Sequence, residues 1–343
     1  MLSRVAESIF WMSRYVERAE NVARFIDVNL HLSLDVGPDL ERQWDPLIFT
    51  TGDQESFHER FGQATQENVL QFLTFDGENP NSVLSCLRTA RENARTVREM
   101  ISSQMWEELN KFFLMVRCAT PDKVLASPFD FFGQIKQAGY LLEGVAESTM
   151  SRGEAWHFRR MGRFVERADK TSRILDVKYY WLLPNSSEVG TPLDTIQWAA
   201  LLKSANALEM YRKHHGRITP AQVAEFLILD RHFPRAMHFC LMAAEQSLLA
   251  ITGGTPGTFH NVAEQRVGRL RAELDYTHLD EIIAEGLHEF IDRFQTSLNG
   301  AGEAICETFF ATQPDAEAAS ASRAKRAKMV QTQVQNATQV SNA

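Results

Sequence analysis

Two segments of the sequence carry the same pattern of charged residues. Residues 12–28 and 161–177 agree at nine of 17 positions, at an offset of 149. The charged residues of the first segment are Arg14, Glu17, Arg18, Glu20, Arg24 and Asp27. Those of the second segment are Arg163, Glu166, Arg167, Asp169, Arg173 and Asp176. Arginine offers a planar fork of donors that suits carboxylates and phosphates, and glutamate can orient an arginine, bind an amine or act as a general base. The two segments are therefore candidates for a polar site that binds an anionic or peptide-like ligand.

Helical spacing predicts that these charges pair with one another inside each segment. In the first segment Arg14 can reach Glu17, and Glu20 can reach Arg24. Arg24 can also reach Asp27, which would complete a self-paired stripe along the helix. Such a ladder on a solvated face would stabilise its helix by only a few tenths of a kcal/mol per pair.

Aromatic residues on the polar side of the first segment argue for a different environment. Phe10, Trp11 and Phe25 make this helix apolar over much of its circumference, which predicts a central position. Burying an unpaired ion is costly, so charges on a central helix must be paired or face a cavity. Two interpretations stay open, a buried structural network and a polar site between the two copies.

A second polar stripe has the helical spacing i, i+3, i+7, i+10. It consists of Arg88, Arg91, Arg95 and Arg98. Guanidinium groups on one helical face suit carboxylates or phosphates, whereas neutralisation by Glu92 and Glu99 of the same helix is the structural alternative. The predicted ligand-binding residues are Arg14, Glu17, Arg18, Arg91, Arg95, Arg163, Glu166 and Arg167, and the catalytic candidates are Glu17 and Glu166.

Metal and cysteine chemistry find little support in the sequence. Three Glu-x-x-His pairs occur, at Glu55/His58, Glu154/His157 and Glu285/His288. This motif is typical of carboxylate-bridged di-iron bundles, in which Glu17 and Glu166 could supply the further carboxylates. The pairs are not at repeat-equivalent positions, so we predict no metal and no other cofactor and keep a di-metal protein as a further alternative. The four cysteines are widely spaced and indicate neither a disulfide framework nor a nucleophile.

The elements that must position these residues are predicted to be helices. Apolar residues recur at helical spacing along most of the chain, and alternating strand-like runs are missing. Gly- and Pro-rich breakers leave room for roughly ten to twelve helices. Trp44 and Trp198 are expected in the core. The fold class is therefore all-α.

The duplication extends beyond the charged segments. At an offset of 154, residues 43–90 match residues 197–244 at 14 of 48 positions without a gap. We expect an internally duplicated helical bundle with approximate two-fold symmetry, in which each unit has about five or six helices. Residues 1–312 would form one domain from two repeats, about 1–150 and 151–312. Residues 313–343, which contain no aromatic residue, Leu or Ile, are predicted to be a disordered tail with a basic cluster.

Charge and composition exclude some functional classes. The chain of 343 residues has 36 Lys and Arg against 44 Asp and Glu, a net charge of −8, which argues against a duplex-DNA binder. No apolar stretch is long enough to span a bilayer, and Arg4 and Glu7 precede any apolar run, which argues against a signal peptide. We expect a cytoplasmic protein with neither nucleic acid nor membrane as a partner.

Several of these segments together resemble a known family. They are residues 15–24 (YVERAENVAR), the copy around Glu166 and Arg167, residues 90–95 (ARENAR) and residues 226–234. They are similar to the alpha-E family, a group of uncharacterised bacterial all-helical proteins named for a Glu-Arg motif. The resemblance covers about residues 1–310. It places the motif at Glu17-Arg18 and, in the copy, at Glu166-Arg167.

The resemblance also implies a functional setting. Members of the family are commonly encoded beside, or fused to, circularly permuted ATP-grasp ligase-like proteins and transglutaminase-like proteases, in systems suspected of making or processing amide-linked peptides. The first hypothesis is therefore a binding or scaffold partner of an ATP-grasp-type ligase. The alternative is an enzyme for amide or aminoacyl transfer, with a Glu as base and Arg stabilising negative charge. A homo-oligomer stays open.

Overall fold

The architecture is entirely helical in the part of the chain that the structure describes. The computed structural model describes residues 1–36, 44–181 and 191–311, and these contain sixteen α-helices, one π-helix and no strand. The predicted all-α class is confirmed. The number of helices exceeds the expected ten to twelve because several short helices, among them Gln66–Leu70 and Pro121–Ala126, lie inside the segments between the long ones.

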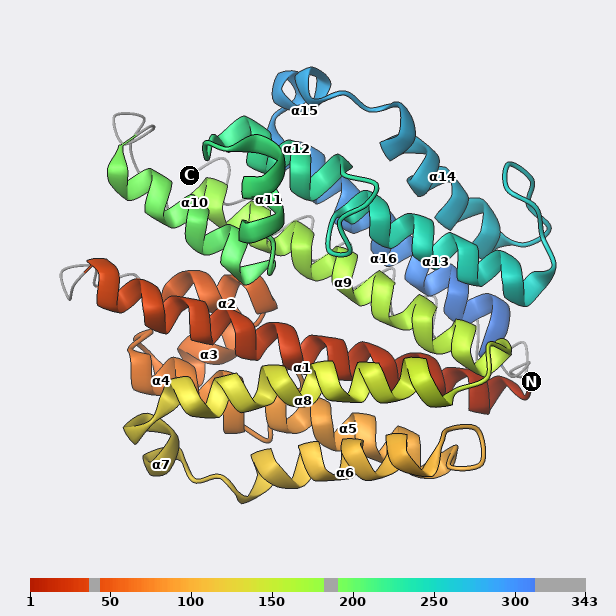
Figure 1. The fold of residues 1–343 in the computed structure, drawn as a ribbon, viewed down its shortest axis with the longest axis horizontal. Coiled ribbons are helices and arrows are strands. Elements are labelled where there is room, and N and C mark those ends of the chain that lie inside the picture. The colour runs from red at the N-terminus through yellow and green to blue at the C-terminus, as the bar shows by residue number, and fades with distance from the viewer. Residues whose placement is uncertain (37–43, 182–190, 312–343) are drawn as a thin grey trace.

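Two long helices, α1 (Ser3–Val36) and α9 (Glu154–Trp181), pack against each other at the centre (Figure 1). The sequence from 3 to 36 has no glycine or proline that would interrupt the first helix. Every residue from Ala19 to Leu30 is buried, which confirms the predicted central position of α1. Charged residues on these two helices must therefore find partners inside the protein.

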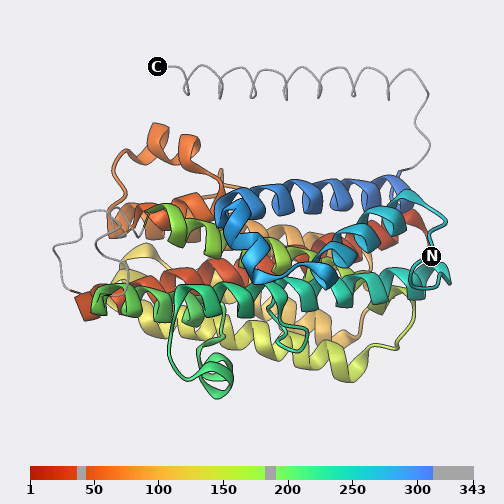
Figure 2. The ribbon, with the colours of Figure 1, turned by 90° about the horizontal axis from the view of Figure 1, so that it is seen from above.

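The remaining helices of each half surround the central pair. In the first half these are α2 (Asp45–Thr51), α3 (Gln54–Phe61), α4 (Gln66–Leu70), the π-helix η1 (Gln71–Phe75), α5 (Val83–Thr96), α6 (Ser103–Cys118), α7 (Pro121–Ala126) and α8 (Pro128–Thr149). In the second half they are α10 (Pro192–Ser204), α11 (Leu208–His215), α12 (Pro220–Leu229), α13 (Met237–Thr252), α14 (Val262–Tyr276), α15 (Leu279–Glu285) and α16 (Leu287–Phe309). Helices α5 and α8 pack on α1, and α13 and α16 pack on α9. The axes of the long helices of both halves lie roughly parallel or antiparallel to one another (Figure 2).

Equivalent signals start and end the helices of the two halves. Helices α5 and α13 begin at Val83 and Met237, which are 154 residues apart like the matched sequence segments. Thr65 and Thr219 both cap a helix by accepting a hydrogen bond from a backbone N–H three residues later. Helix α2 packs on α9 and α10 packs on α1, so each half also contacts the central helix of the other. The internal duplication itself stays a prediction from the sequence.

The apolar core is divided between two clusters that meet at the central helices. One contains Phe10 and Met12 of α1 with most apolar residues of the second half, and the other contains Phe57, Phe72 and Phe132. Trp44 and Trp198 are 7% and 2% exposed, as expected for core residues. No helix among the described residues combines the length and the hydropathy that a bilayer span requires. The predicted tail, residues 313–343, lies outside the described residues, and the division into domains stays a prediction.

Candidate functional site

The two central helices approach each other closely where small residues face them. The hydroxyl of Ser13 in α1 donates to the carbonyl oxygen of Arg159 in α9 at 2.6 Å. Gly162 of α9 lies against the carbonyl group of Phe10 in α1, where a Cβ atom would overlap it. Ser13 and Phe10 correspond to Gly162 and Arg159 at the offset of 149, so the two contacts exchange when the halves are exchanged. The crossing brings the charged segments of both helices within reach of each other.

Glu166 of α9 is held by arginines from α1. Its carboxylate accepts hydrogen bonds from Arg14 Nε at 2.9 Å and from Nε and Nη2 of Arg18 at 2.7 and 3.0 Å. The side chain of Glu166 is 0% exposed, and Lys170 Nζ lies 3.6 Å from it. Arg18 also donates to Asn81 Oδ1 at 2.9 Å. Both oxygens of this buried carboxylate are therefore used.

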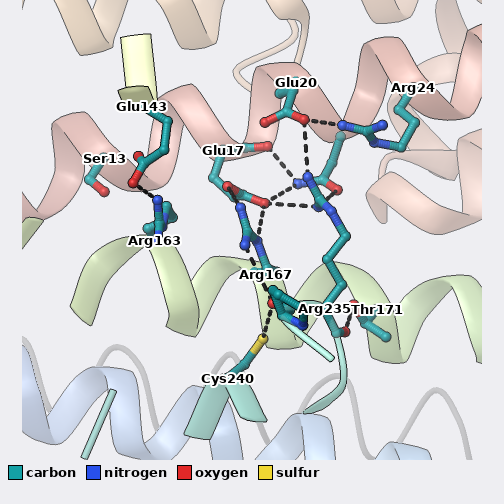
Figure 3. A network of polar contacts seen from close by, with 12 residues as sticks. Ser13, Glu17, Glu20, Arg24, Glu143, Arg163, Arg167, Thr171, Arg235 and Cys240 are labelled. Atoms are coloured by element: carbon teal, nitrogen blue, oxygen red, sulfur yellow. Dashed lines mark hydrogen bonds and ion pairs between the residues drawn. The ribbon is translucent and has the colours of Figure 1, made fainter. Parts of the chain in front are cut away.

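Glu17 of α1 is held in the reciprocal way (Figure 3). Nε and Nη2 of Arg167 in α9 each donate to Glu17 at 2.8 Å. Arg235, just before α13, donates from Nη1 at 3.1 Å, and Asn21 donates from Nδ2 at 2.9 Å. The two consecutive residues Glu17 and Arg18 thus pair with Arg167 and Glu166 of the other half, and these four residues are called the ER crossing below.

The electrostatics of the ER crossing favour ionised carboxylates. Burial raises the pKa of Glu17, but attraction to Arg167 and Arg235 outweighs it, so the pKa is far below its ordinary value. Burial likewise raises the pKa of Glu166, and attraction to Arg18 and Arg14 brings it well below the ordinary value. A general base needs a pKa near the working pH and a free lone pair. The geometry therefore favours ion pairing over proton transfer for both catalytic candidates.

The other charges of the duplicated segments confirm the predicted ladder only in part. Glu20 pairs with Arg24 and, in the copy, Asp169 with Arg173, as helical spacing predicted. The predicted pairing of Arg14 with Glu17 is wrong, because Arg14 turns to Glu166 across the crossing. The predicted pairing of Arg24 with Asp27 is also wrong. Asp27 instead pairs with Lys136 of α8 at 2.5 Å, because that face of α1 is covered by another helix rather than by water.

The arginine stripe of α5 lies apart from the ER crossing. Arg91 donates from Nε to Asn110 of α6 at 2.7 Å and from Nη1 to Glu92 at 2.9 Å. Arg95 donates to Glu92 at 2.8 Å, and Arg98 stacks over Trp106. Of the eight predicted ligand-binding residues, the structure gathers Arg14, Glu17, Arg18, Arg163, Glu166 and Arg167 around the crossing and leaves Arg91 and Arg95 outside it. Glu92 pairs with both of these arginines, as the structural alternative predicted.

Beside the ER crossing lies a cavity of about 70 Å³, which is called the crossing cavity below. Its polar lining comes from α1, α8, α9 and Arg235 in the segment before α13. These residues are Ser13, Glu17, Glu20, Tyr140, Glu143, Arg159, Arg163, Arg167 and Arg235. Two larger clefts are open to the surface. One, of about 890 Å³, lies at α13 and α14. The other, of about 770 Å³, lies at α1, α8 and α11. Of these three spaces among the described residues, the crossing cavity is the one lined by Glu17 and Arg167 of the ER crossing.

Sequence reasoning missed several of the residues that build this site. Arg235, Arg159 and Glu143 were not among the candidates. A signal for Arg235 exists, because the residue before it, Pro234, matches Pro80 at the offset of 154, and Arg235 stands where the first half has Asn81. No comparable signal marks Arg159 or Glu143, since their roles depend on how α8 and α9 pack.

The predicted metal alternative gains no support from the geometry. Among the described residues, no group of three or more His, Cys, Asp or Glu side chains is placed to hold a metal ion. Glu154 instead pairs with the N-terminal ammonium group at 2.7 Å, and His288 pairs with Asp176 at 2.6 Å. Cys86 and Cys240 are buried, and burial raises the pKa of each thiol to about 12. They are poor nucleophiles, in line with the sequence.

Comparison with known sequences identifies a family. Residues 1–310 match the Alpha-E family, which is described as a predicted alpha-helical domain with a conserved ER motif. The chain is a member of the Alpha-E family. Uncharacterised proteins of Mycobacterium bovis and Mycobacterium tuberculosis are 24% identical to it over 337 residues. These matches cover 90% of this Alpha-E chain but only 37% of the relatives' own length. No solved structure matches.

Proposed function

We propose that this chain is a binding and scaffold partner in an ATP-grasp-type amide-ligase system, and that its Arg/Glu centre receives an anionic or peptide-like ligand. The pairing state of Glu17 and Glu166 supports binding over catalysis. Both carboxylates are buried, hydrogen-bonded by arginines of the opposite half, and lowered in pKa. Such groups fix the relative position of two helices and stay ionised at neutral pH.

The assignment of the partner rests on the family. The Alpha-E resemblance implies ligase-like and transglutaminase-like proteins as neighbours or fused domains. The mycobacterial relatives support a modular role, since this chain spans 37% of their length and the remainder is further chain. A chain that matches only part of longer relatives is suited to act beside the rest of such proteins.

The experiment combines the purified chain with the ATP-grasp-type protein encoded nearest to it. Light scattering after size-exclusion chromatography gives the mass of the complex, and ADP release by the ligase is titrated with the chain. We expect a complex at about 10 μM, where a micromolar affinity suffices, and an ADP-release rate that saturates at a stoichiometric ratio. An unrelated helical protein of the same net charge is the control.

Two outcomes would overturn the proposal. If no complex forms and ADP release is unchanged, the chain is not a partner of that ligase. If the chain forms an amide product at strongly substoichiometric amounts, it is an enzyme, as in the alternative with a Glu base.

A further inference from the structure

The crossing cavity has more positive than negative charge in its lining. Three carboxylates line it, those of Glu17, Glu20 and Glu143. Four guanidinium groups line it, those of Arg159, Arg163, Arg167 and Arg235. The next charges outward, Arg24 on Glu20 and Glu147 on Arg159, are one of each sign and leave this excess unchanged. A buried guanidinium group without a matching carboxylate is costly unless an anion joins it.

Two arginines that line this cavity each have a donor without an acceptor. The Nε atoms of Arg159 and Arg163 are buried and have no hydrogen-bond partner. Arg159 is 3% exposed, and its Nη atoms donate to Glu143 and Glu147. Arg163 pairs with Glu143 through Nη1 (Figure 3). Buried N–H groups are almost always satisfied, so these two donors point to a missing acceptor.

The difference between the halves explains why Arg163 is left over. Its counterpart at the offset of 149 is Arg14, whose Nε donates to Glu166. The corresponding carboxylate for Arg163 would be Glu17, but Arg167, Arg235 and Asn21 already use it. At the position of Arg235 the first half has Asn81, which is neutral. The second half thus adds a cation to the centre without a carboxylate at the equivalent place.

The pKa values agree with a deficit of negative charge. Burial lowers the pKa of Arg163 to about 9, and burial lowers that of Arg159 to about 10. For Arg18 and Arg167 the same burial is outweighed by attraction to a carboxylate, and their pKa values are raised. Arg159 and Arg163 are therefore less compensated by carboxylates than Arg18 and Arg167.

We propose that the crossing cavity is a binding site for a small monoanion, either a halide ion or a single carboxylate group, which pairs with the guanidinium groups of Arg163 and Arg159. The cavity volume of about 70 Å³ is about twice the volume of a water molecule in the liquid, which suits an anion of this size. Gly139 lines the cavity without a side chain, and a Cβ atom there would lie 3.0 Å from Glu20 Cγ.

Tyr140 lies between this cavity and a surface cleft. It lines both the crossing cavity and the cleft of about 770 Å³, and its hydroxyl accepts a hydrogen bond from Arg24 Nη1 at 3.0 Å. The residue is 49% exposed. A carboxylate at the end of a peptide could reach the cavity from this cleft, which also has Lys136 and Lys203 in its lining. The inference deepens the proposed function, on which its biological role rests, but the binding is measured on the chain alone and can fail or succeed separately.

Urea unfolding of the purified chain at constant ionic strength tests this site. Chloride, formate or acetate replaces methanesulfonate, which is a larger, tetrahedral anion and serves as the reference. An anion at 100 times its Kd multiplies the folding equilibrium constant by about 100, so the unfolding midpoint should rise with anion concentration. We expect this rise in the wild type and in Arg95→Gln, whose exposed arginine is a matched control, but not in Arg163→Gln.

The same titration separates the two sources of the anion. A response to chloride alone indicates a free halide, whereas a response to acetate and to a short peptide acid, but not to its amide, indicates a peptide carboxylate. Bromide soaked into crystals of the unmodified protein should give an anomalous peak between Arg159 and Arg163, which decides the question even if Arg163→Gln does not fold. An equal anion response of wild type and Arg163→Gln, or the absence of a bromide peak in the cavity together with no response to acetate, would overturn the inference.

Discussion

Replacing Glu166 by glutamine tests whether the ER crossing holds the two halves together. The substitution preserves the shape of the side chain but removes its charge. Arg14 and Arg18, whose side chains are each 15% exposed, would then keep their charges without this carboxylate. Removing one partner of a buried ion pair typically costs about 3–5 kcal/mol. We expect Glu166→Gln to lower the free energy of unfolding at pH 7 by this amount.

The dependence of this loss on pH follows from the lowered pKa of Glu166. The unfolded chain has an ordinary glutamate pKa of about 4.3. Since the folded pKa is lower, the stabilisation by Glu166 is fully present above the unfolded pKa and is lost as the pH falls towards the folded value. The wild type should lose about 1.4 kcal/mol per pH unit through this group below pH 4.3, and the variant should not. The difference in free energy of unfolding between the wild type and Glu166→Gln therefore becomes smaller in acid. The contributions of the other carboxylates are the same in both proteins and cancel in this difference.

Urea unfolding followed by circular dichroism at several pH values measures both effects. Glu92→Gln is the matched control, since Glu92 forms exposed pairs with arginines on α5 and an exposed pair contributes about 0–1 kcal/mol. If Glu166→Gln costs no more than Glu92→Gln at pH 7, the ER crossing does not hold the halves together. A gap that stays constant down to pH 3.5 would refute the assigned direction of the pKa.

Further predictions concern the helix crossing and the thiols. A methyl group at Gly162 would overlap a backbone carbonyl of α1, so Gly162→Ala should destabilise the fold by about 1–3 kcal/mol or more, whereas Gly144→Ala, in open space on α8, should stabilise it by up to about 1 kcal/mol. Thermal unfolding of both variants checks this, and equal shifts would contradict the close crossing. Iodoacetamide should label the exposed Cys118 first and should reach the buried Cys86 and Cys240, whose pKa values are raised, only after denaturation. Mass spectrometry of the native and denatured protein gives the order of labelling.

Much of the fold could be predicted from the sequence, because hydrophobic periodicity and self-similarity are local or nearly local signals. Residues 12–28 and 161–177 predicted the two helices that lie at the centre, and the aromatic residues around Phe10 predicted that the first would be buried. The short helices were missed because five to eight residues contain too few turns for a clear period.

The partners of the charges were harder to predict than their place on the helix. Helical spacing allows Arg14 to pair with Glu17, but the same face of α1 meets α9, and Glu166 competes successfully for Arg14. Spacing within a helix does not tell which carboxylate lies across an interface. The role of Arg159 depends on Glu143 and Glu147 of α8, a helix whose packing no pattern in the sequence specifies.

The symmetry of the ER crossing and the asymmetry next to it indicate different roles. Glu17 and Arg18 pair with Arg167 and Glu166 in a pattern that maps onto itself when the halves are exchanged, so it can hold the halves together without distinguishing them. Asn81 and Arg235 break this symmetry, because one is neutral and the other adds a charge at the centre. Because Arg235 takes the place of Arg163 at Glu17, the two halves differ at the crossing cavity, and this difference favours binding of one anion there.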